Sequence, residues 1–438
     1  MKGLADQPNH IVELLEGGTT LEDVIDGHVQ EQALDDKSVF VVADLGALMR
    51  QHVQWQNTVS RISAYYPVST NSSPAVLQVL ASLGLGFVCA NKGEVSLALD
   101  YGVPPENIIF SGVCKPLSHI KYAARNGVDL LVCDSETELC KIARSHPNAK
   151  LLVQVTTWAQ VAETSMAFGC SLKSCRHLLE MAKSLGVQVV GATFHIPASC
   201  KDLQAYGHAL SDARCVFDMG EELGFNMSIL DIGGGFSGSE YQLKQVHMAV
   251  RPLLDVYFPS QSEVQVIAEP GSYYVSSAFT LAVNIIGKKV VAQDWGGRAP
   301  EALTLDDEPE FLYYLNDGVY GSFSCKLLGN SIPPPAVHKR ASMVEQPVFS
   351  SSLWGPTLDS LDRVVERCLL PELGPGDWLV FNNMGASGLE NLSSFSDPSA
   401  CRPPVYYTVS TTDWYEMQEA GVALDSIMKN FSLVQYGA

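Results

Sequence analysis

Short runs of β-branched and aliphatic residues alternate with longer segments of helical periodicity between residues 61 and 270. Such short apolar runs, bounded by turn residues, are typical of buried strands, whereas spacings of three and four indicate helices. The expected strands are Ile62–Val68, Gly86–Ala90, Asn107–Ser111, Asp129–Cys133, Lys150–Thr156, Val187–Ile196, Met227–Ile232 and Val264–Glu269. Expected helices between them include Pro74–Leu83, Leu117–Arg125, Glu136–Ser145, Leu172–Leu185 and Tyr241–Tyr257. The pattern therefore predicts eight successive strand–helix units.

Eight such units are the number that closes a parallel sheet into a (β/α)8 TIM barrel. A doubly wound open sheet is the alternative that the same alternation allows. We therefore expect an α/β fold with a barrel over residues 45–280.

The pattern changes after Pro270. A β-rich run covers Tyr273–Val291, and shorter strands with frequent turns follow at Phe311–Leu315, Asp377–Phe381 and Pro404–Val409. The early strand Val39–Asp44 precedes the eight units and is free to join these strands, and Asp413–Asn430 has the pattern of a helix. We expect a mainly-β domain, a sandwich or a barrel-like sheet, from residues 1–44 and 281–438.

Composition restricts the kinds of partner. With 46% hydrophobic and 17% charged residues, the chain resembles an ordinary globular protein, and no run approaches the roughly 18 apolar residues of a membrane span. Residues 1–20 lack the apolar stretch of a signal peptide. The formal charge of −20 disfavours nucleic acid, whose phosphates would be repelled. We expect neither a membrane nor a nucleic acid as partner.

Eleven cysteines are scattered without a Cys-x-x-Cys pair, and the two that lie closest together are Cys170 and Cys175. An odd number without regular spacing predicts neither a disulfide framework nor a zinc or other metal site. Reduced thiols fit a protein of the cytoplasm or the nucleus.

Three features carry possible chemistry. The segment Leu230–Gly238 matches G-x-G-x-x-G between a strand and a helix, where backbone amides can hold a phosphate, although a tight glycine turn explains it equally simply. Glu269 ends the eighth expected strand, where a barrel gathers its active site and a carboxylate can pair with a pyridinium nitrogen. A solvated strand end is the alternative for Glu269, and His195, which ends the sixth strand, is equally compatible with a structural role.

Several longer strings resemble the eukaryotic ornithine decarboxylase family, a family of pyridoxal-phosphate enzymes. They are Lys121–Ala124, Ser211–Gly220, Leu230–Gly235, Ala268–Gly271, Asn316–Phe323 and Trp354–Thr357. The opening Met-Lys-Gly, Asp413–Gln418 and Met428–Phe431 are similar to its non-catalytic branch, the antizyme inhibitors. The resemblance covers nearly the whole chain and implies the barrel and a β domain.

The same resemblance implies that the catalytic groups are depleted. Ser69 stands where the family has its Schiff-base lysine, and Leu358 where it has a reactive cysteine. Further departures are Val88 for an aspartate, Gln154 for an arginine, Pro197-Ala198 for Gly-Ser, Ser272 for the phosphate-binding arginine, Gly329 for an aspartate and Ser387 for a tyrosine. The matching positions are His195, Gly233, Gly234, Gly235, Glu269, Tyr320, Asp359 and Phe395. We therefore expect no cofactor and no catalytic residue, with Ser69, His195, Gly233–Gly235 and Glu269 as vestiges of a former site.

Two departures concern assembly. The lysine that ties the family's dimer aligns with Ala167, and a tyrosine of the dimer face aligns with Leu328, whereas the acidic partner of that lysine is kept as Asp362. The resemblance therefore implies a monomer or a weak homodimer.

One segment is basic in an otherwise acidic chain. Residues 114–150 carry six Lys and Arg against four Asp and Glu, so their charge is +2 and that of the remainder is −22. A solvated outer helix of a barrel explains such charges without a partner. The segment nevertheless matches the antizyme-binding element of the family through Ile120–Ala124 and Asp134–Ala143. The residues that the match assigns to antizyme binding are Lys121, Tyr122, Arg125, Asp134, Glu138, Lys141 and Arg144.

The resemblance implies a catalytically inactive ornithine decarboxylase homologue that binds antizyme. Such a protein would release ornithine decarboxylase from inhibition and degradation, and so promote polyamine synthesis and uptake. Two alternatives stay open: a residual pyridoxal-phosphate-dependent amino-acid decarboxylase, and a diverged duplicate that no longer binds antizyme. The second is kept because antizyme inhibitors generally retain the lysine and the cysteine that are Ser69 and Leu358 in this chain.

Overall fold

The computed structural model describes residues 10–32, 37–158, 168–197, 200, 202–291, 309–328, 331–338, 346–386, 403–424 and 426–430. The chain divides into two compact units. One unit comprises residues 48–274 with 417–424, and the other comprises residues 1–47, 275–416 and 425–438. The expected boundaries 44/45 and 280/281 compare with divisions at 47/48 and 274/275, and residues 417–424, which were expected in the β domain, belong to the first unit.

The first unit is a closed barrel of parallel strands. Its strands are β3 (Ile62–Pro67), β4 (Gly86–Cys89), β5 (Ile108–Phe110), β6 (Leu130–Cys133), β7 (Lys150–Val155), β8 (Gln188–Phe194), β9 (Ile229–Asp231) and β10 (Gln265–Ala268). Each strand pairs with the next in the chain, and β10 also pairs with β3, through Val266 opposite Ile62. An open doubly wound sheet would leave both edges unpaired, so the prediction of a barrel is confirmed and the alternative is wrong.

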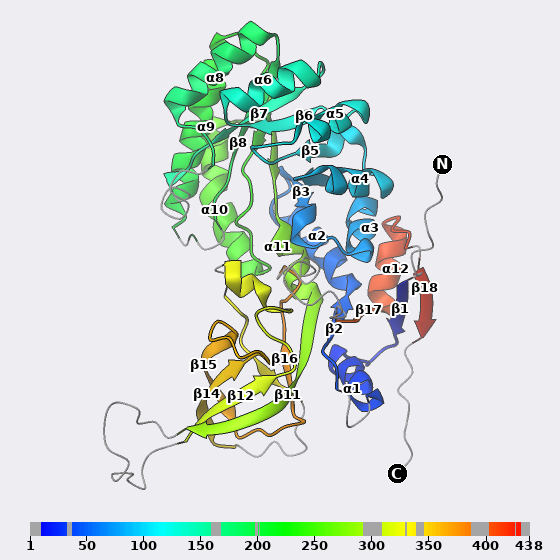
Figure 1. The fold of residues 1–438 in the computed structure, drawn as a ribbon. Helices are drawn as coiled ribbons and strands as arrows, with labels where there is room; N and C mark the ends of the chain where they lie inside the picture. Colours follow the sequence, from blue (N-terminus) through cyan, green and yellow to red (C-terminus); the bar gives the residue numbers. More distant parts are fainter. Residues whose placement is uncertain are drawn as a thin grey trace, which may run out of the picture. The chain divides into compact units, whose positions relative to one another are not determined.

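Helices follow the outside of this barrel (Figure 1). They are α2 (Leu45–Thr58), α3 (Pro74–Ser82), α4 (Lys92–Asp100), α5 (Leu117–Arg125), α6 (Glu136–Ser145), α8 (Leu172–Leu185), α9 (Gln204–Glu222), α10 (Glu240–Tyr257) and α11 (Gly271–Val275). Short 3-10 turns of this unit are η1 (Val68–Thr70), η2 (Pro105–Asn107) and η3 (Ser260–Ser262), whereas η4 (Ser276–Ala278) and η5 (Ser324–Leu328) belong to the second unit. The ends of α8 show how local sequence sets a boundary: Ser171 caps its first turn, and Gly186 ends it in a left-handed conformation.

Apolar side chains fill the inside of the barrel. Its buried cluster consists of Tyr65, Val88, Ile109, Leu130, Val132, Leu152 and Ile267, against which Val190 and Ile229 pack. The barrel is therefore a packed core, and any polar chemistry belongs to the ends of its strands.

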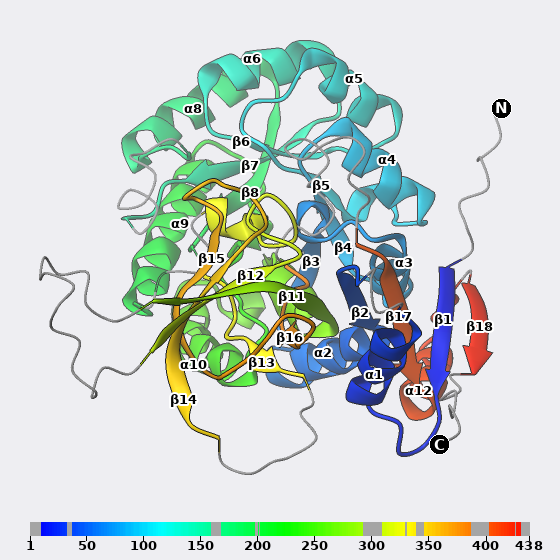
Figure 2. The same ribbon diagram turned by 60° about the horizontal axis from the view of Figure 1, so that its bottom comes forward.

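The second unit is built on a ten-stranded mixed sheet. Its strands are β1 (His10–Leu15), β2 (Phe40–Asp44), β11 (Phe279–Val291), β12 (Glu310–Leu315), β13 (Ala336–Val337), β14 (Val348–Trp354), β15 (Arg363–Pro371), β16 (Trp378–Phe381), β17 (Val405–Ser410) and β18 (Ser426–Asn430). Strands from both ends of the chain meet here, since β1 lies between β17 and β18 (Figure 2). The unit also contains α1 (Leu21–Glu31), and α12 (Thr411–Glu419) follows β17 directly.

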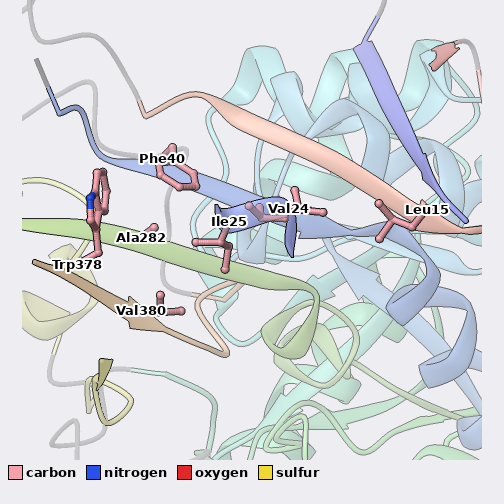
Figure 3. Close-up of a cluster of buried hydrophobic side chains, with 8 residues drawn as sticks. Leu15, Val24, Ile25, Phe40, Ala282, Trp378 and Val380 are labelled. Atoms are coloured by element: carbon pink, nitrogen blue, oxygen red, sulfur yellow. The ribbon is translucent and has the colours of Figure 1, made fainter. Parts of the chain in front are cut away.

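A second apolar cluster holds α1 to this sheet. Val24 and Ile25 of α1 face Phe40 of β2, Ala282 of β11 and Trp378 of β16 (Figure 3). Both helix residues are almost fully buried. The amphipathic helix therefore closes one face of the β sheet, and the prediction of a separate mainly-β domain is confirmed.

Two predicted elements were wrong in extent. The expected helix Asp413–Asn430 ends at Glu419, because Gly421 adopts a φ of +81° and its amide bonds back to the Gln418 carbonyl; Ser426–Asn430 then forms the edge strand β18. The expected strand from Tyr273 begins instead as α11. There the Tyr273 hydroxyl donates to the Gln51 carbonyl over 3.1 Å, so tertiary packing overrides β propensity.

Candidate functional site

The residues assigned to the vestigial site meet at the C-terminal ends of four barrel strands. Ser69 lies exposed in η1, directly after β3, and His195 lies exposed after β8. The glycine loop follows β9, and Glu269 follows β10. The Glu269 amide donates to the Gly233 carbonyl over 2.8 Å, and the Gly234 amide donates to His195 Nδ1 over 3.3 Å. The structure thus brings His195, the glycine loop and Glu269 into contact, and Ser69 follows β3, the strand that pairs with β10.

The glycine loop is tight because neighbouring backbone leaves no room for side chains. Gly233 has a φ of +65°, and a Cβ atom there would lie 2.1 Å from the Phe194 carbonyl oxygen. Gly235 has a φ of +92°, and its Cβ would lie 2.7 Å from the Ile196 carbonyl oxygen. The left-handed φ values and the close approach of neighbouring backbone both require glycine at these two positions. The fold therefore explains the glycines without a bound ligand.

A pair of acids, buried Asp231 and partly exposed Glu269, lies at this loop. Asp231 is fully buried; it accepts from Thr193 Oγ1 over 2.9 Å and from the Gly233 amide over 2.9 Å. Burial raises the pKa of Asp231 to about 6. Burial also raises the pKa of Glu269 well above its ordinary value, and the adjacent Asp231, to which it is hydrogen-bonded, raises it further. Sequence reasoning missed Asp231, although its place in Leu-Asp-Ile-Gly, one residue after a buried strand position, was a usable signal.

The family departures fall in three environments. Val88 belongs to the apolar cluster inside the barrel, where a carboxylate would be desolvated. Gln154 on β7 and Ser272 on α11 are partly exposed, whereas Leu358 is fully exposed. Positions 167, 198, 329, 387 and 395 of the sequence-based comparison lie outside the described residues.

Pyridoxal phosphate does not fit these residues. It needs an amine for the Schiff base, donors for its phosphate and an ionised carboxylate for its pyridinium nitrogen. Ser69 offers a hydroxyl, the amides of Gly233 and Gly234 donate to Asp231 and His195, and the raised pKa of Glu269 disfavours its ionised form. The site keeps the shape of a cofactor loop without the groups that would hold the cofactor.

The residues assigned to antizyme binding lie on α5, on α6 and in the loop before α6. Lys121, Arg125 and Arg144 are exposed, and Tyr122 is partly exposed, with Lys92 Nζ of α4 placed 4.9 Å from its ring centroid. Helix α5 carries cations and no acidic residue. These cationic and aromatic side chains form an outward-facing surface, which we call the α5–α6 surface, and sequence reasoning missed the contribution of Lys92.

Three further assigned residues, Glu138, Lys141 and Asp134, form hydrogen bonds or ion pairs within the protein. The Glu138 carboxylate, whose side chain is 2% exposed, lies 2.5 Å from Lys141 Nζ and 3.7 Å from Nζ of Lys115, whose side chain is fully buried. Lys115 Nζ also donates to the carbonyls of Gly112 and Val132, and Lys141 Nζ to that of Lys115. Burial lowers the pKa of Lys115, and Glu138 opposes this effect.

This buried network changes the expected division of roles. Glu138 is not available for a direct contact in this conformation, and Lys141 is partly engaged by it. Asp134 is partly exposed, and its carboxylate accepts from the Gly169 amide over 3.1 Å. The network joins the loop before α5 to α6, so Glu138 and Lys141 shape the surface that the exposed cations present. No signal in the sequence distinguishes buried Lys115 from its exposed neighbours.

The acidic residue linked to assembly is also internal. Asp362 is 1% exposed, and its carboxylate accepts from the Val319 amide over 2.7 Å and from both the amide and the hydroxyl of Thr357. Its place within a turn gives Asp362 a structural role. Nothing is described of the Leu328 side chain.

Among the described residues, no group of three or more His, Cys, Asp and Glu side chains is arranged to hold a metal ion. In the same part of the chain, no helix combines the length and the apolar character needed to cross a membrane.

Comparisons with known proteins agree with this geometry. The family model for the pyridoxal-binding domain of pyridoxal-dependent decarboxylases matches residues 45–276. Antizyme inhibitor 1 of Pongo abelii is 55% identical over 99% of this chain and 96% of its own, and ornithine decarboxylase of Rattus norvegicus is 47% identical over 93% and 88%. The crystal structure of the Paramecium bursaria Chlorella virus arginine decarboxylase superimposes with a TM-score of 0.77 at 27% identity, over 88% of this chain and all of the viral enzyme.

Proposed function

This chain belongs to the family of pyridoxal-dependent decarboxylases, and from that premise we propose that it is a non-catalytic member that binds antizyme. The observation that carries the proposal is 55% identity to antizyme inhibitor 1 along nearly the whole chain, in a protein with serine at the Schiff-base position. By occupying antizyme, it would free ornithine decarboxylase and promote polyamine synthesis and uptake.

The site at the strand ends supports the absence of catalysis. A decarboxylase of this family depends on a covalent anchor, and Ser69 has no amine to supply it. Loss of the phosphate-binding arginine at Ser272 removes a charge-assisted interaction of roughly 1.5–3 kcal/mol. We propose that no cofactor binds at physiological concentrations, and that the acid pair and the glycine loop persist because they support the fold.

The α5–α6 surface supports partner binding. Lys121, Arg125 and Arg144 are exposed on two packed helices of a protein with a formal charge of −20. A cationic patch on an acidic protein accelerates encounter with an acidic face and disfavours other orientations. We propose that these three cations and Tyr122 contact antizyme, while Glu138 positions them.

Competition gives the mechanism its quantitative form. Antizyme held by this chain is unavailable to ornithine decarboxylase, and the fraction held depends on the concentration of the decoy relative to its dissociation constant. No chemical step is needed. We further propose that the protein acts as a monomer or a weak homodimer in the cytoplasm or the nucleus, where its cysteines stay reduced.

Charge reversal tests the surface. Lys121→Glu combined with Arg125→Glu should lower the affinity for purified antizyme at least tenfold, with a smaller effect at high salt. The control is Lys173→Glu with Lys183→Glu on α8, because these lysines are also exposed and the pair of substitutions changes the charge by the same amount. Unchanged affinity of the first variant would remove the α5–α6 surface from the proposal.

Two outcomes separate the alternatives. Failure of the unmodified chain to bind antizyme, with normal folding, would favour a diverged duplicate without that partner. An aldimine absorbance after incubation with pyridoxal phosphate, or release of carbon dioxide from ornithine, would favour a residual decarboxylase. We expect antizyme binding and neither of the catalytic signals.

A further inference from the structure

Two buried thiols contact each other beside the barrel. Cys170 Sγ lies 3.1 Å from Cys175 Sγ, and the two residues are 7% and 0% exposed. Because a disulfide joins its sulfurs at about 2.05 Å, the pair has to close by only about 1 Å. The sequence suggested only that these cysteines are neighbours along the chain, and the fold turns that proximity into contact.

Local backbone structure holds the two sulfurs on the same side. Cys170 forms an isolated bridge with Val155 of β7, where its amide donates to the Gln154 carbonyl over 2.9 Å. Cys175 lies in the first turn of α8, and its amide donates to the Ser171 carbonyl over 2.8 Å. Since only four residues separate the cysteines, bond formation requires a small local adjustment and no movement of the barrel.

We propose that Cys170 and Cys175 form a redox modification site, at which a hydroperoxide closes an intramolecular disulfide. Cys170 reacts first, because it is the more exposed of the two and lies between partly exposed Gly169 and exposed Ser171. Its sulfur attacks hydrogen peroxide, the O–O bond breaks, and sulfenic acid and water form. The Cys175 sulfur then attacks the sulfenic sulfur, the S–O bond breaks, and a second water leaves. Two thiols are oxidised, and one peroxide is reduced to two waters.

Burial controls the rate of this reaction. Hydrogen bonding to Cys175 and burial raise the pKa of Cys170. The reactive thiolate is therefore scarce while Cys170 stays buried, and the reaction with peroxide should be slow. Cys114 and Cys215 are exposed and should react with peroxide before the pair does. Cys175 is already within reach of an oxidised Cys170, so the disulfide should form in preference to sulfinic acid.

The bond would stabilise the segment that leads into α8. The Gly169 amide donates to Asp134 Oδ2 over 3.1 Å, and Thr156 Oγ1 donates to the Phe168 carbonyl over 3.0 Å. A disulfide would tie this segment to the first turn of α8. Oxidation should therefore slow chymotryptic cleavage after Phe168 severalfold, compared with the reduced protein.

Trypsin provides a direct assay, because its sites place the two cysteines in different peptides. Cys170 lies in residues 151–173 and Cys175 in residues 174–176, and each of these peptides contains no other cysteine. The full-length protein is treated with hydrogen peroxide, its free thiols are blocked with N-ethylmaleimide after unfolding, and it is digested without reduction. We expect a cross-linked peptide that disappears on reduction with dithiothreitol.

Variants decide whether the pair is responsible. Cys175→Ser should abolish the cross-link and leave Cys170 as sulfenic or sulfinic acid, whereas Cys215→Ser should leave the cross-link unchanged. The proposal is overturned if both cysteines of the pair remain alkylatable after Cys114 and Cys215 are fully oxidised. It is equally overturned if Cys170 of the unmodified protein passes to sulfinic acid without the cross-link.

Discussion

Removal of one carboxylate should test the buried network behind the α5–α6 surface. In Glu138→Ala, the ammonium group of Lys115 loses its counter-ion while its side chain stays fully buried. Leaving one member of a buried ion pair alone typically costs about 3–5 kcal/mol. The carbonyls of Gly112 and Val132 still accept from Lys115 Nζ, and Lys141, whose side chain is 35% exposed, can be rehydrated, so we expect the lower end, about 3 kcal/mol.

Urea unfolding at pH 7, followed by circular dichroism and tryptophan fluorescence, measures this loss as a shift of midpoint at constant slope. Glu136→Ala is the matched control, since Glu136 lies on the same helix with its side chain 56% exposed and paired to His177. Its loss should change the free energy of unfolding by no more than about 0.5 kcal/mol. Lys115→Met with Glu138→Leu removes both charges and should recover most of the stability, because an apolar pair leaves no buried charge uncompensated.

The pH dependence distinguishes a buried charge from a simple cavity. The folded-state pKa of Lys115 is depressed below its unfolded value, so between these two values the unfolded chain binds more protons and stability rises with pH. Without Glu138, which raises this pKa, the amine should lose its proton still more readily. The loss in free energy of unfolding caused by Glu138→Ala should therefore be smaller at pH 9 than at pH 7. A deficit equal to that of Glu136→Ala, or one independent of pH, would refute the reasoning.

Two further predictions concern the barrel. Gly191→Ala should destabilise it by several kcal/mol in urea unfolding, because the added Cβ would lie 1.7 Å from the Ile229 carbonyl oxygen. The control Gly224→Ala has a φ of +87° but open space around the added Cβ, and should cost only about 1 kcal/mol. Glu269→Gln should improve stability more at pH 8 than at pH 5. The folded-state pKa values of Asp231 and Glu269 are raised above the unfolded values. Their stabilisation is therefore complete below the unfolded values and declines as pH rises, for Asp231 through about 6, whereas the amide donates at every pH. An equal change in the free energy of unfolding at both pH values would contradict that account.

Much of the barrel could be predicted because its determinants are local. Apolar runs such as Leu130–Cys133 and the helical period of Leu172–Leu185 recur within each unit, and the structure has both as expected. The strands β1, β14 and β15 of the second unit were not predicted, since their pairing joins residues far apart in the chain. For the same reason, β18 was mistaken for the end of a helix.

The sequence by itself determined the missing amine at Ser69, the series of eight strand–helix units and the local excess of cations on α5, because residue identity and short-range periodicity carry this information. Only the tertiary structure decided which charges face solvent and which groups meet. It buries Lys115 against Glu138, pairs Asp231 with Glu269 and brings Cys170 into contact with Cys175. Burial and contact depend on packing between separate elements, and packing changes pKa, reactivity and availability for a partner in ways that residue type alone does not specify.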